Sequence, residues 1–197
     1  MKFKRKADRN MLKEAKRAQI YQLKITLRFI RPAVWRRVQV ASDVTLAKLH
    51  RIIQMAMGWY DSHLHQFIVG ETYYGVPSRE DLSKVKDEKK VRLDQVLSGP
   101  GRKMVYEYDF GDGWEHSLVL ERVLEPERGV RYPRCIGGAR ACPPEDCGGV
   151  GGYANFLQAI SDPGHEEHDE YLEWIGGEFD PEEFDLEEFD TALRHIE

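Results

Sequence analysis

The chain has no run of apolar residues long enough to cross a membrane, since no stretch approaches the roughly 18 apolar residues that a spanning helix needs. Residues 1–10 are charged, and no apolar segment of the signal-peptide kind follows them. Cysteine is scarce: three occur among 197 residues, which cannot make the fully paired disulfide framework of a small secreted protein. We therefore expect a soluble, cytoplasmic protein without a membrane partner.

The composition that remains is sufficient for a folded domain. Hydrophobic residues make up 41% of the chain and charged residues 32%, a balance typical of globular rather than disordered proteins. The length fits one domain, and a chain of this size buries roughly 70% of its unfolded surface on folding. No disulfide or metal is needed to hold such a core together.

Charge is distributed unevenly. Residues 1–19 contain eight Lys or Arg and two acidic residues, whereas residues 161–197 contain fifteen Asp or Glu and one Arg. We predict a basic N-terminal arm over 1–19 and a single domain over 20–197 with an acidic, helical C-terminal part. The arm could contact nucleic acid, because clustered basic residues neutralise phosphates, or it could be a solvated terminus. The acidic end opposes binding of the whole protein to a polyanion.

Hydrophobic periodicity predicts the N-terminal elements. Apolar and polar residues alternate over 21–29, which is typical of a half-buried strand, and residues 34–40 are expected to complete a hairpin. Helical spacing predicts a helix over 45–57, ended by Gly58. Further predicted elements are strands at 65–69, 72–74, 104–109 and 114–123, a short helix at 93–97, and helices at 153–160, 165–174 and 186–196.

This order of elements predicts an α+β fold: a mainly antiparallel sheet with C-terminal helices packed on it. The opening ββαβ run is similar to a β-grasp arrangement, a likeness of fold that carries no function. Residues 76–90 are rich in charge and are predicted to form a surface loop. Residues 131–152 are rich in Pro, Gly and Cys without any period, and we predict an ordered loop there.

The densest group of polar residues, DFGDGWEH over 109–116, lies on the turn predicted between two strands. Asp109 and Asp112 could bind a ligand or accept hydrogen bonds from the amides of the turn. Trp114 and His116 share one face of the second strand, so His116 could be a core-edge histidine, a ligand or a base. A kinase function is excluded, because neither a Gly-rich loop with its strand lysine nor an HRD loop precedes the DFG letters.

A second segment, CIGGARACPPEDCGG over 135–149, contains all three cysteines. Thiolates bind zinc well, and Cys135, Cys142 and Cys147 with His116 are our candidate zinc site. Their spacing is wider than the CxxC of zinc knuckles, so buried, reduced thiols are the alternative. No other cofactor is predicted.

We predict that the 109–116 turn and the 142–149 loop meet in space and form the functional surface. Both segments are irregular and polar, and such segments on a rigid scaffold are where sites usually lie. Glu145 and Asp146 would then join the carboxylates of the turn. The candidate binding residues are Asp109, Asp112, Trp114, His116, Glu145 and Asp146.

Such crowding of carboxylates has a physical cost, because like charges at close range raise carboxyl pKa values unless they are relieved. We predict relief by an arginine, Arg134 or Arg140, together with backbone amides; a bound cation and separation of the carboxylates into solvent are the alternatives. Two histidine pairs, His63 with His65 and His165 with His168, lack the HExxH spacing of zinc proteases, and we interpret them as surface residues.

Taken together, these segments resemble a known family. The strings YQLKITLRFIRPAVWRRVQV, TLAKLHRIIQMAMGW, HLHQF, YDFGDGWEH and CPPEDCGG are similar to the plasmid pRiA4b Orf-three-like family, over about residues 21–196. The last two strings together would rarely arise by chance. The resemblance implies a compact α+β domain that is frequent in bacteria and archaea and on mobile elements, with no established activity.

Three classes of function remain open from the sequence. The leading hypothesis is a module that binds a protein or small-ligand partner through a polar, aromatic-edged site. The second is a metal-assisted hydrolase in which Asp, Glu and His hold a hydrated cation and activate water. The third is a nucleic-acid accessory protein that acts through the basic arm.

Overall fold

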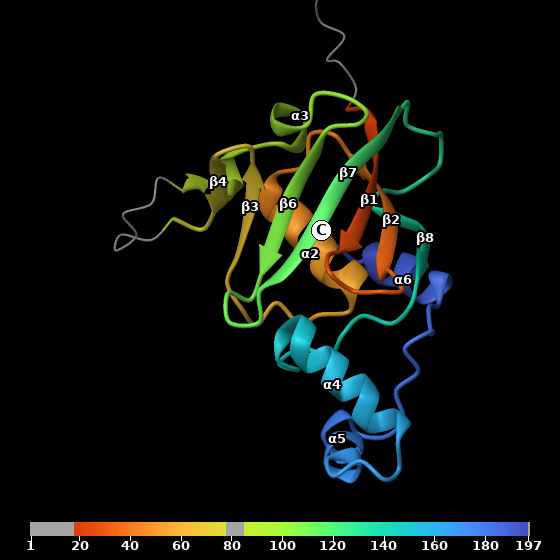
Figure 1. Cartoon of the computed structure of the whole chain (residues 1–197). Helices are drawn as coiled ribbons and strands as arrows, with labels where there is room; N and C mark the ends of the chain where they lie inside the picture. The colour runs from red at the N-terminus through yellow and green to blue at the C-terminus, as the bar shows by residue number, and fades with distance from the viewer. Residues whose placement is uncertain (1–17, 78–84, 197) are drawn as a thin grey trace, which may run out of the picture.

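The computed structural model of the chain describes residues 18–77 and 85–196 (Figure 1). The basic arm predicted over 1–19 lies outside the described residues, except for its last two positions. Within the described ranges, no helix is long and apolar enough to span a membrane. The elements in chain order are β1 (Ile20–Leu27), β2 (Trp35–Ala41), α2 (Leu46–Met57), β3 (His65–Val69), β4 (Thr72–Gly75), β5 (Lys86–Asp87), η1 (Glu88–Lys90), α3 (Leu93–Val96), β6 (Lys103–Tyr108), β7 (Trp114–Leu124), β8 (Arg134–Ala139), α4 (Gly149–Ser161), α5 (His168–Ile175) and α6 (Leu186–Leu193).

The described strands form one eight-stranded sheet in the order β5-β4-β3-β6-β7-β1-β2-β8. Neighbouring strands pair antiparallel, except for β4 and β5, which are parallel. The predicted α+β fold with a mainly antiparallel sheet is therefore confirmed. The predicted ββα run is present as β1, β2 and α2, but β3 does not pair with this hairpin, because β6 and β7 lie between them.

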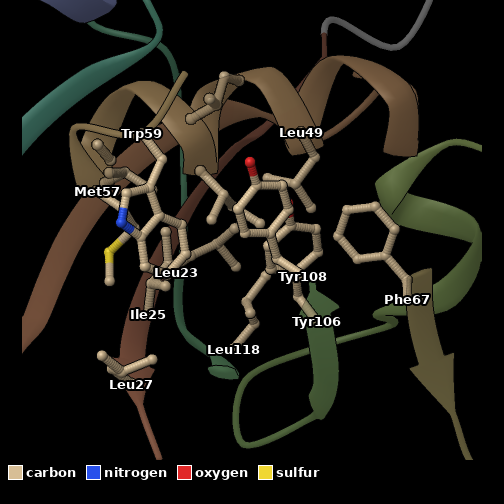
Figure 2. Close-up of a cluster of buried hydrophobic side chains, with 14 of the residues drawn as sticks. Leu23, Ile25, Leu27, Leu49, Met57, Trp59, Phe67, Tyr106, Tyr108 and Leu118 are labelled. Carbon is tan, nitrogen blue, oxygen red and sulfur yellow. The ribbon is translucent and has the colours of Figure 1, made fainter. Parts of the chain in front are cut away.

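The main core lies between the sheet and α2 (Figure 2). Leu23, Ile25 and Leu27 of β1 are fully buried, since β1 is an interior strand flanked by β7 and β2. Helix α2 begins where the Thr45 side chain accepts a hydrogen bond from the Lys48 amide, and it ends at Gly58 in the left-handed conformation. The helix thereby covers the sheet, and its C-terminal end leads the chain to the end of the sheet where the candidate site lies.

The C-terminal helices are arranged in two groups. Helix α6 packs against β8 and α2, so it covers part of the sheet as predicted. Helices α4 and α5 pack on each other and lie below the lower end of the sheet in Figure 1. The loop that precedes α4 therefore passes close to the turn between β6 and β7.

Two segments that we predicted as loops contain regular structure. Strand β8 lies within 131–152 and pairs with β2 at the edge of the sheet. Two glycines, Gly137 and Gly138, remove the periodic side chains that would identify this strand in the sequence. Likewise β5 and η1 lie at the end of 76–90, where Glu88 is buried. Pairing with a partner strand, rather than a local pattern, creates β8 and β5.

Candidate functional site

Three loops meet at the lower end of the sheet: residues 59–64 after α2, the turn 109–113 and the loop 142–148. The Trp59 indole donates to the Pro143 carbonyl at 2.9 Å, and the Gly148 amide donates to Asp112 Oδ2 at 3.2 Å. We call this region the three-loop face. The structure thus brings the DFGDGWEH turn and the CPPEDCGG loop together; their functional role stays a prediction.

Asp109 shapes the turn between β6 and β7. It adopts a positive φ of 54°, and its Oδ1 atom accepts hydrogen bonds from the amides of Gly111 at 3.0 Å and Asp112 at 3.4 Å. This is the local bonding that makes Asp favourable in turns. The second oxygen, Oδ2, faces His63 at 3.7 Å. The turn therefore fixes the direction in which this half of the carboxylate points.

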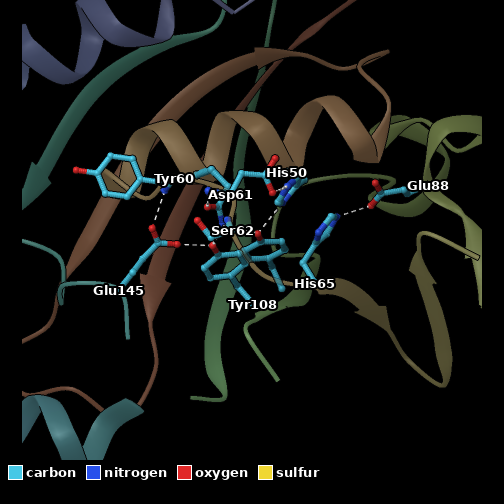
Figure 3. A network of polar contacts seen from close by, with 10 residues as sticks. His50, Tyr60, Asp61, Ser62, His65, Glu88, Tyr108 and Glu145 are labelled. Atoms are coloured by element: carbon cyan, nitrogen blue, oxygen red, sulfur yellow. Dashed lines mark hydrogen bonds and ion pairs between the residues drawn. The ribbon is translucent and has the colours of Figure 1, made fainter. Parts of the chain in front are cut away.

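Glu145 anchors the loop 142–148 to the other two segments (Figure 3). Its carboxylate accepts hydrogen bonds from the Tyr108 hydroxyl and from the Tyr60 amide, the latter at 2.9 Å. Burial raises the pKa of the Tyr108 phenol well above its ordinary value, and the neighbouring Glu145 carboxylate adds to the shift. Tyr108 therefore stays protonated and remains a donor. The next residue, Asp146, has a φ of 62° and places Oδ1 3.0 Å from His63 Nε2.

Among the described residues, no arginine forms an ion pair with this group of carboxylates. Arg140 forms an ion pair with Glu182 at 3.0 Å, and Arg134 lines a different cavity with Asp190. The predicted pairing of these arginines with the carboxylates is wrong, whereas backbone amides do bind the carboxylates: they are the amides of Tyr60, Gly111, Asp112 and Gly148. Sequence reasoning could not foresee this, because the partners of Arg140 come from the distant segment before α6.

His63 is the residue of this site that sequence reasoning missed. Its side chain is only 29% exposed and lies between Asp109 and Asp146, so our interpretation of it as a surface residue is wrong. The signal available was its place in a short segment between α2 and β3, which the chain must use to cross the end of the sheet. The position of His63 indicates a role in the site only when the other two loops are seen to lie beside it.

The neighbouring His65 is also misinterpreted as a surface residue, because it belongs to a buried network (Figure 3). The rings of His50 and His65 stack with centroids 3.4 Å apart. His50 contacts Asp61 Oδ1 and the Tyr106 hydroxyl, each at 2.7 Å, and His65 Nε2 contacts Glu88 Oε2 at 2.8 Å. Burial lowers the pKa of His50, and the adjacent His65 lowers it further. This network is satisfied within the protein and ties α2 to β3 and η1.

Two predicted binding residues, Trp114 and His116, are buried beneath the three-loop face. Trp114 is 1% exposed and His116 fully buried, and the Trp59 ring packs against both. Their alternation on β7 directs both side chains into the core. They support the face from below and present no side-chain surface to a partner.

Burial of His116 predicts a loss of stability in acid. Full burial lowers the pKa of His116 to about 4 from an ordinary value of 6.5. Below about pH 6.5 this histidine is protonated in the unfolded chain, whereas in the folded chain it stays neutral until about pH 4. The free energy of unfolding therefore falls as the pH falls through this window. We expect this histidine alone to account for about 2–3 kcal/mol between pH 7 and about pH 4.5.

Urea unfolding of His116→Gln at these two pH values measures the effect. The variant should lose about 2–3 kcal/mol less than the wild type on acidification, while His195→Gln, at an exposed histidine, serves as the matched substitution. An unchanged pH dependence in His116→Gln would show that this imidazole is not held neutral.

The three cysteines do not gather around one point. Cys142 contacts the Arg36 guanidinium at 3.3 Å and the Met57 sulfur at 3.8 Å, and Cys135 faces the Gly137 carbonyl. In the part of the chain that the structure describes, no cysteine belongs to a group of three potential ligands within 4.8 Å. Burial raises the thiol pKa of Cys142 to about 11 and that of Cys147 to about 12. The geometry therefore does not support zinc at the cysteines with His116, and the thiols are protonated at neutral pH.

A cavity of about 430 Å³ opens beside the three-loop face. Residues of α5 and the loop 142–148 form its walls, including Pro144, Asp146 and Trp174. Tyr60 at its rim is 85% exposed, and Trp174 is 45% exposed. The cavity thus combines accessible aromatic rings with a carboxylate, a surface suited to holding a ligand.

Comparison with known proteins agrees with the resemblance seen in the sequence. A family model described as "Plasmid pRiA4b ORF-3-like protein" matches residues 19–188. "Uncharacterized protein y4hQ" of Sinorhizobium fredii (strain NBRC 101917 / NGR234) is 42% identical over 160 residues, which cover 81% of this chain and 82% of that protein. The crystal structure of the protein of unknown function MM3350 from Methanosarcina mazei Go1 matches with a TM-score of 0.79 and 38% identity, covering 86% of this chain and 97% of that one.

Proposed function

This chain belongs to the plasmid pRiA4b ORF-3-like family, and we propose that its three-loop face binds a positively charged segment of another protein. The names of its relatives state no activity, so the proposal rests on the site. The observation that carries it is the cavity beside the face, where exposed aromatic rings stand next to carboxylates.

The aromatic rings suit a basic side chain. Tyr60 and Trp174 both line the cavity but come from different segments: Tyr60 follows α2, and Trp174 belongs to α5. A Lys or Arg side chain has an apolar stem that packs on such rings and a cationic end that is attracted to their faces. Glu145 and Asp146 line the same cavity and would meet the charge. Aromatic anchors of this kind supply much of the binding energy at protein interfaces.

The surrounding surface has the matching charge. Within residues 161–196, two carboxylates have ion-pair partners among the described residues: Glu182 with Arg140, and Asp190 with Arg194. The exposed carboxylates of this stretch belong to Asp162, Glu166, Asp169, Glu170, Glu173, Glu178, Asp180, Glu182, Glu183, Asp185, Glu187 and Glu188. Such a field steers a cationic partner toward the cavity and repels a polyanion such as nucleic acid. A basic protein segment is therefore favoured over nucleic acid as the ligand.

We also infer a cytoplasmic location for this interaction. Cys135, Cys142 and Cys147 are all free thiols, which is the usual state of cysteine in a reducing compartment.

Fluorescence or calorimetric titration with a synthetic peptide tests the proposal. A peptide of alternating Arg and Leu should bind, and the same peptide with Glu in place of Arg should not. Tyr60→Ala and Trp174→Ala should each weaken binding by about tenfold. Tyr73→Ala is the matched control, because Tyr73 is an exposed aromatic residue of β4 outside the cavity.

Two results would contradict the proposal. The first is no binding of the basic peptide. The second is binding that falls no more in the Tyr60 and Trp174 variants than in the Tyr73 variant, since that outcome would reflect general attraction to acidic surface.

A further inference from the structure

Three potential metal ligands converge on the three-loop face, one from each loop. They belong to His63, Asp109 and Asp146, and one ligand atom from each residue lies within 4.8 Å of the other two. His63 Nε2 is 3.0 Å from the Asp146 oxygen and 3.7 Å from the Asp109 oxygen. The chain thus places one imidazole and two carboxylates around a single point, although the residues lie up to 83 positions apart (146 minus 63).

The geometry differs from that of a hydrogen-bonded triad. His63 Nε2 is buried from solvent, yet it makes no hydrogen bond with any described residue despite its short separation from Asp146. Its ring nitrogen therefore does not aim at the carboxylate oxygen. Two ligand atoms at about 2.1 Å from one ion, at tetrahedral or octahedral angles, lie about 3.0–3.4 Å apart without bonding to each other. The observed separations are close to this range.

The second group of potential ligands shows the contrast. His50, Asp61 and His65 also offer ligand atoms within 4.8 Å of one another, but both ring nitrogens of His50, Oδ1 of Asp61 and Nε2 of His65 already have partners. His50 bonds through both ring nitrogens, and His65 Nε2 is paired with Glu88. An ion there would have to break existing hydrogen bonds in a buried network, which costs free energy. The His63 group offers ligands that are not otherwise used.

The surroundings of the His63 group hold its ligands in place. Amides of the turn bind the other oxygen of Asp109, and Glu145, the neighbour of Asp146, is held by Tyr108 and Tyr60. Outer hydrogen bonds of this kind orient the ligands in metal sites. The Asp146 side chain is 67% exposed, so an ion can enter from solvent and can keep water at its remaining positions.

We propose that His63, Asp109 and Asp146 bind one divalent transition-metal ion, with Zn²⁺ as the best match. Imidazole nitrogen with carboxylate oxygen suits Zn²⁺, whereas Mg²⁺ prefers sites made of oxygen alone. Three protein ligands leave at least one position of the ion open. This site goes beyond the proposed peptide binding and does not depend on it, although Asp146 belongs to both.

Calorimetric titration of chelator-treated protein with Zn²⁺ alone tests the site. We expect one ion per chain, and we expect Asp146→Asn to weaken binding by more than tenfold. Asp146 is largely exposed, so this variant should fold. His63→Ala should weaken binding at least as much, and Glu170→Gln, an exposed carboxylate of α5, should leave it unchanged.

Cobalt(II) separates this site from the cysteines. A Co²⁺ complex of nitrogen and oxygen ligands lacks the thiolate-to-metal charge-transfer absorption that cysteine ligation produces. The proposal is overturned by a lack of Zn²⁺ binding, by binding that survives Asp146→Asn, or by a thiolate band with Co²⁺. Because no peptide is present, a failure of Zn²⁺ binding leaves the proposed function standing, although both proposals use Asp146.

Discussion

Replacing Trp114 with alanine is expected to lower the free energy of unfolding by about 3–5 kcal/mol. The Trp114 side chain is among the largest fully buried side chains of the described residues, and it packs against the Trp59 ring with centroids 5.9 Å apart. Its removal leaves a cavity between β7 and the segment that follows α2. Because this segment carries Tyr60 and His63, we also expect the three-loop face to lose its fixed geometry. Urea unfolding at neutral pH measures the change.

The matched variant is Trp114→Phe. Phenylalanine keeps most of the ring volume and removes an indole N–H that has no hydrogen-bond partner among the described residues. We expect a cost of only about 1–2 kcal/mol. A Trp114→Ala effect near zero would mean that the side chain is exposed and would contradict its placement in the core.

Replacing Gly152 with alanine is expected to destabilise the protein by about 3 kcal/mol, because the new methyl group has no room. A Cβ atom at this position would overlap the backbone carbonyl of Cys147. That carbonyl cannot move freely, since the loop is held by the bond from the Gly148 amide to Asp112. The loss of stability therefore comes from the forced displacement of the loop that carries Asp146. Urea unfolding measures it.

Gly151→Ala provides the control within the same helix. A Cβ atom at Gly151 meets nothing within 4 Å, and alanine is the better helix former by about 0.5–1 kcal/mol. We expect this variant to be slightly more stable than the wild type. Similar effects at Gly151 and Gly152 would show that helix propensity, rather than the close approach to Cys147, decides the outcome.

The amino-acid sequence is sufficient to predict the elements whose cause is local. The alternation over 21–29 and the helical spacing over 45–57 predict β1 and α2 correctly, because burial of one face imposes those periods. The DFGDG turn is likewise local, since Asp109 bonds to the amides that follow it within the turn. The α+β class rests on these segments, and so does part of the family resemblance.

Features that depend on a partner distant in the sequence could be seen only in the folded structure. Strand β8 exists because β2 offers it an open edge, and its glycines give no period to read. Arg140 turns away from the carboxylates because Pro181 and Glu182 supply its partners.

The site divides in the same way. Asp109 and Asp146 are predicted from the sequence as members of the site, because polar residues on irregular segments are recognisable in the sequence as candidate site residues. His63 was missed, because its role depends on which loops pack beside it. Trp114 and His116 were wrongly predicted to bind a ligand, because their roles depend on which face of β7 turns into the core. Turn hydrogen bonds and hydrophobic periodicity depend on neighbouring residues and can be predicted from them. The convergence of His63, Asp109 and Asp146 instead requires three segments that the sheet brings together.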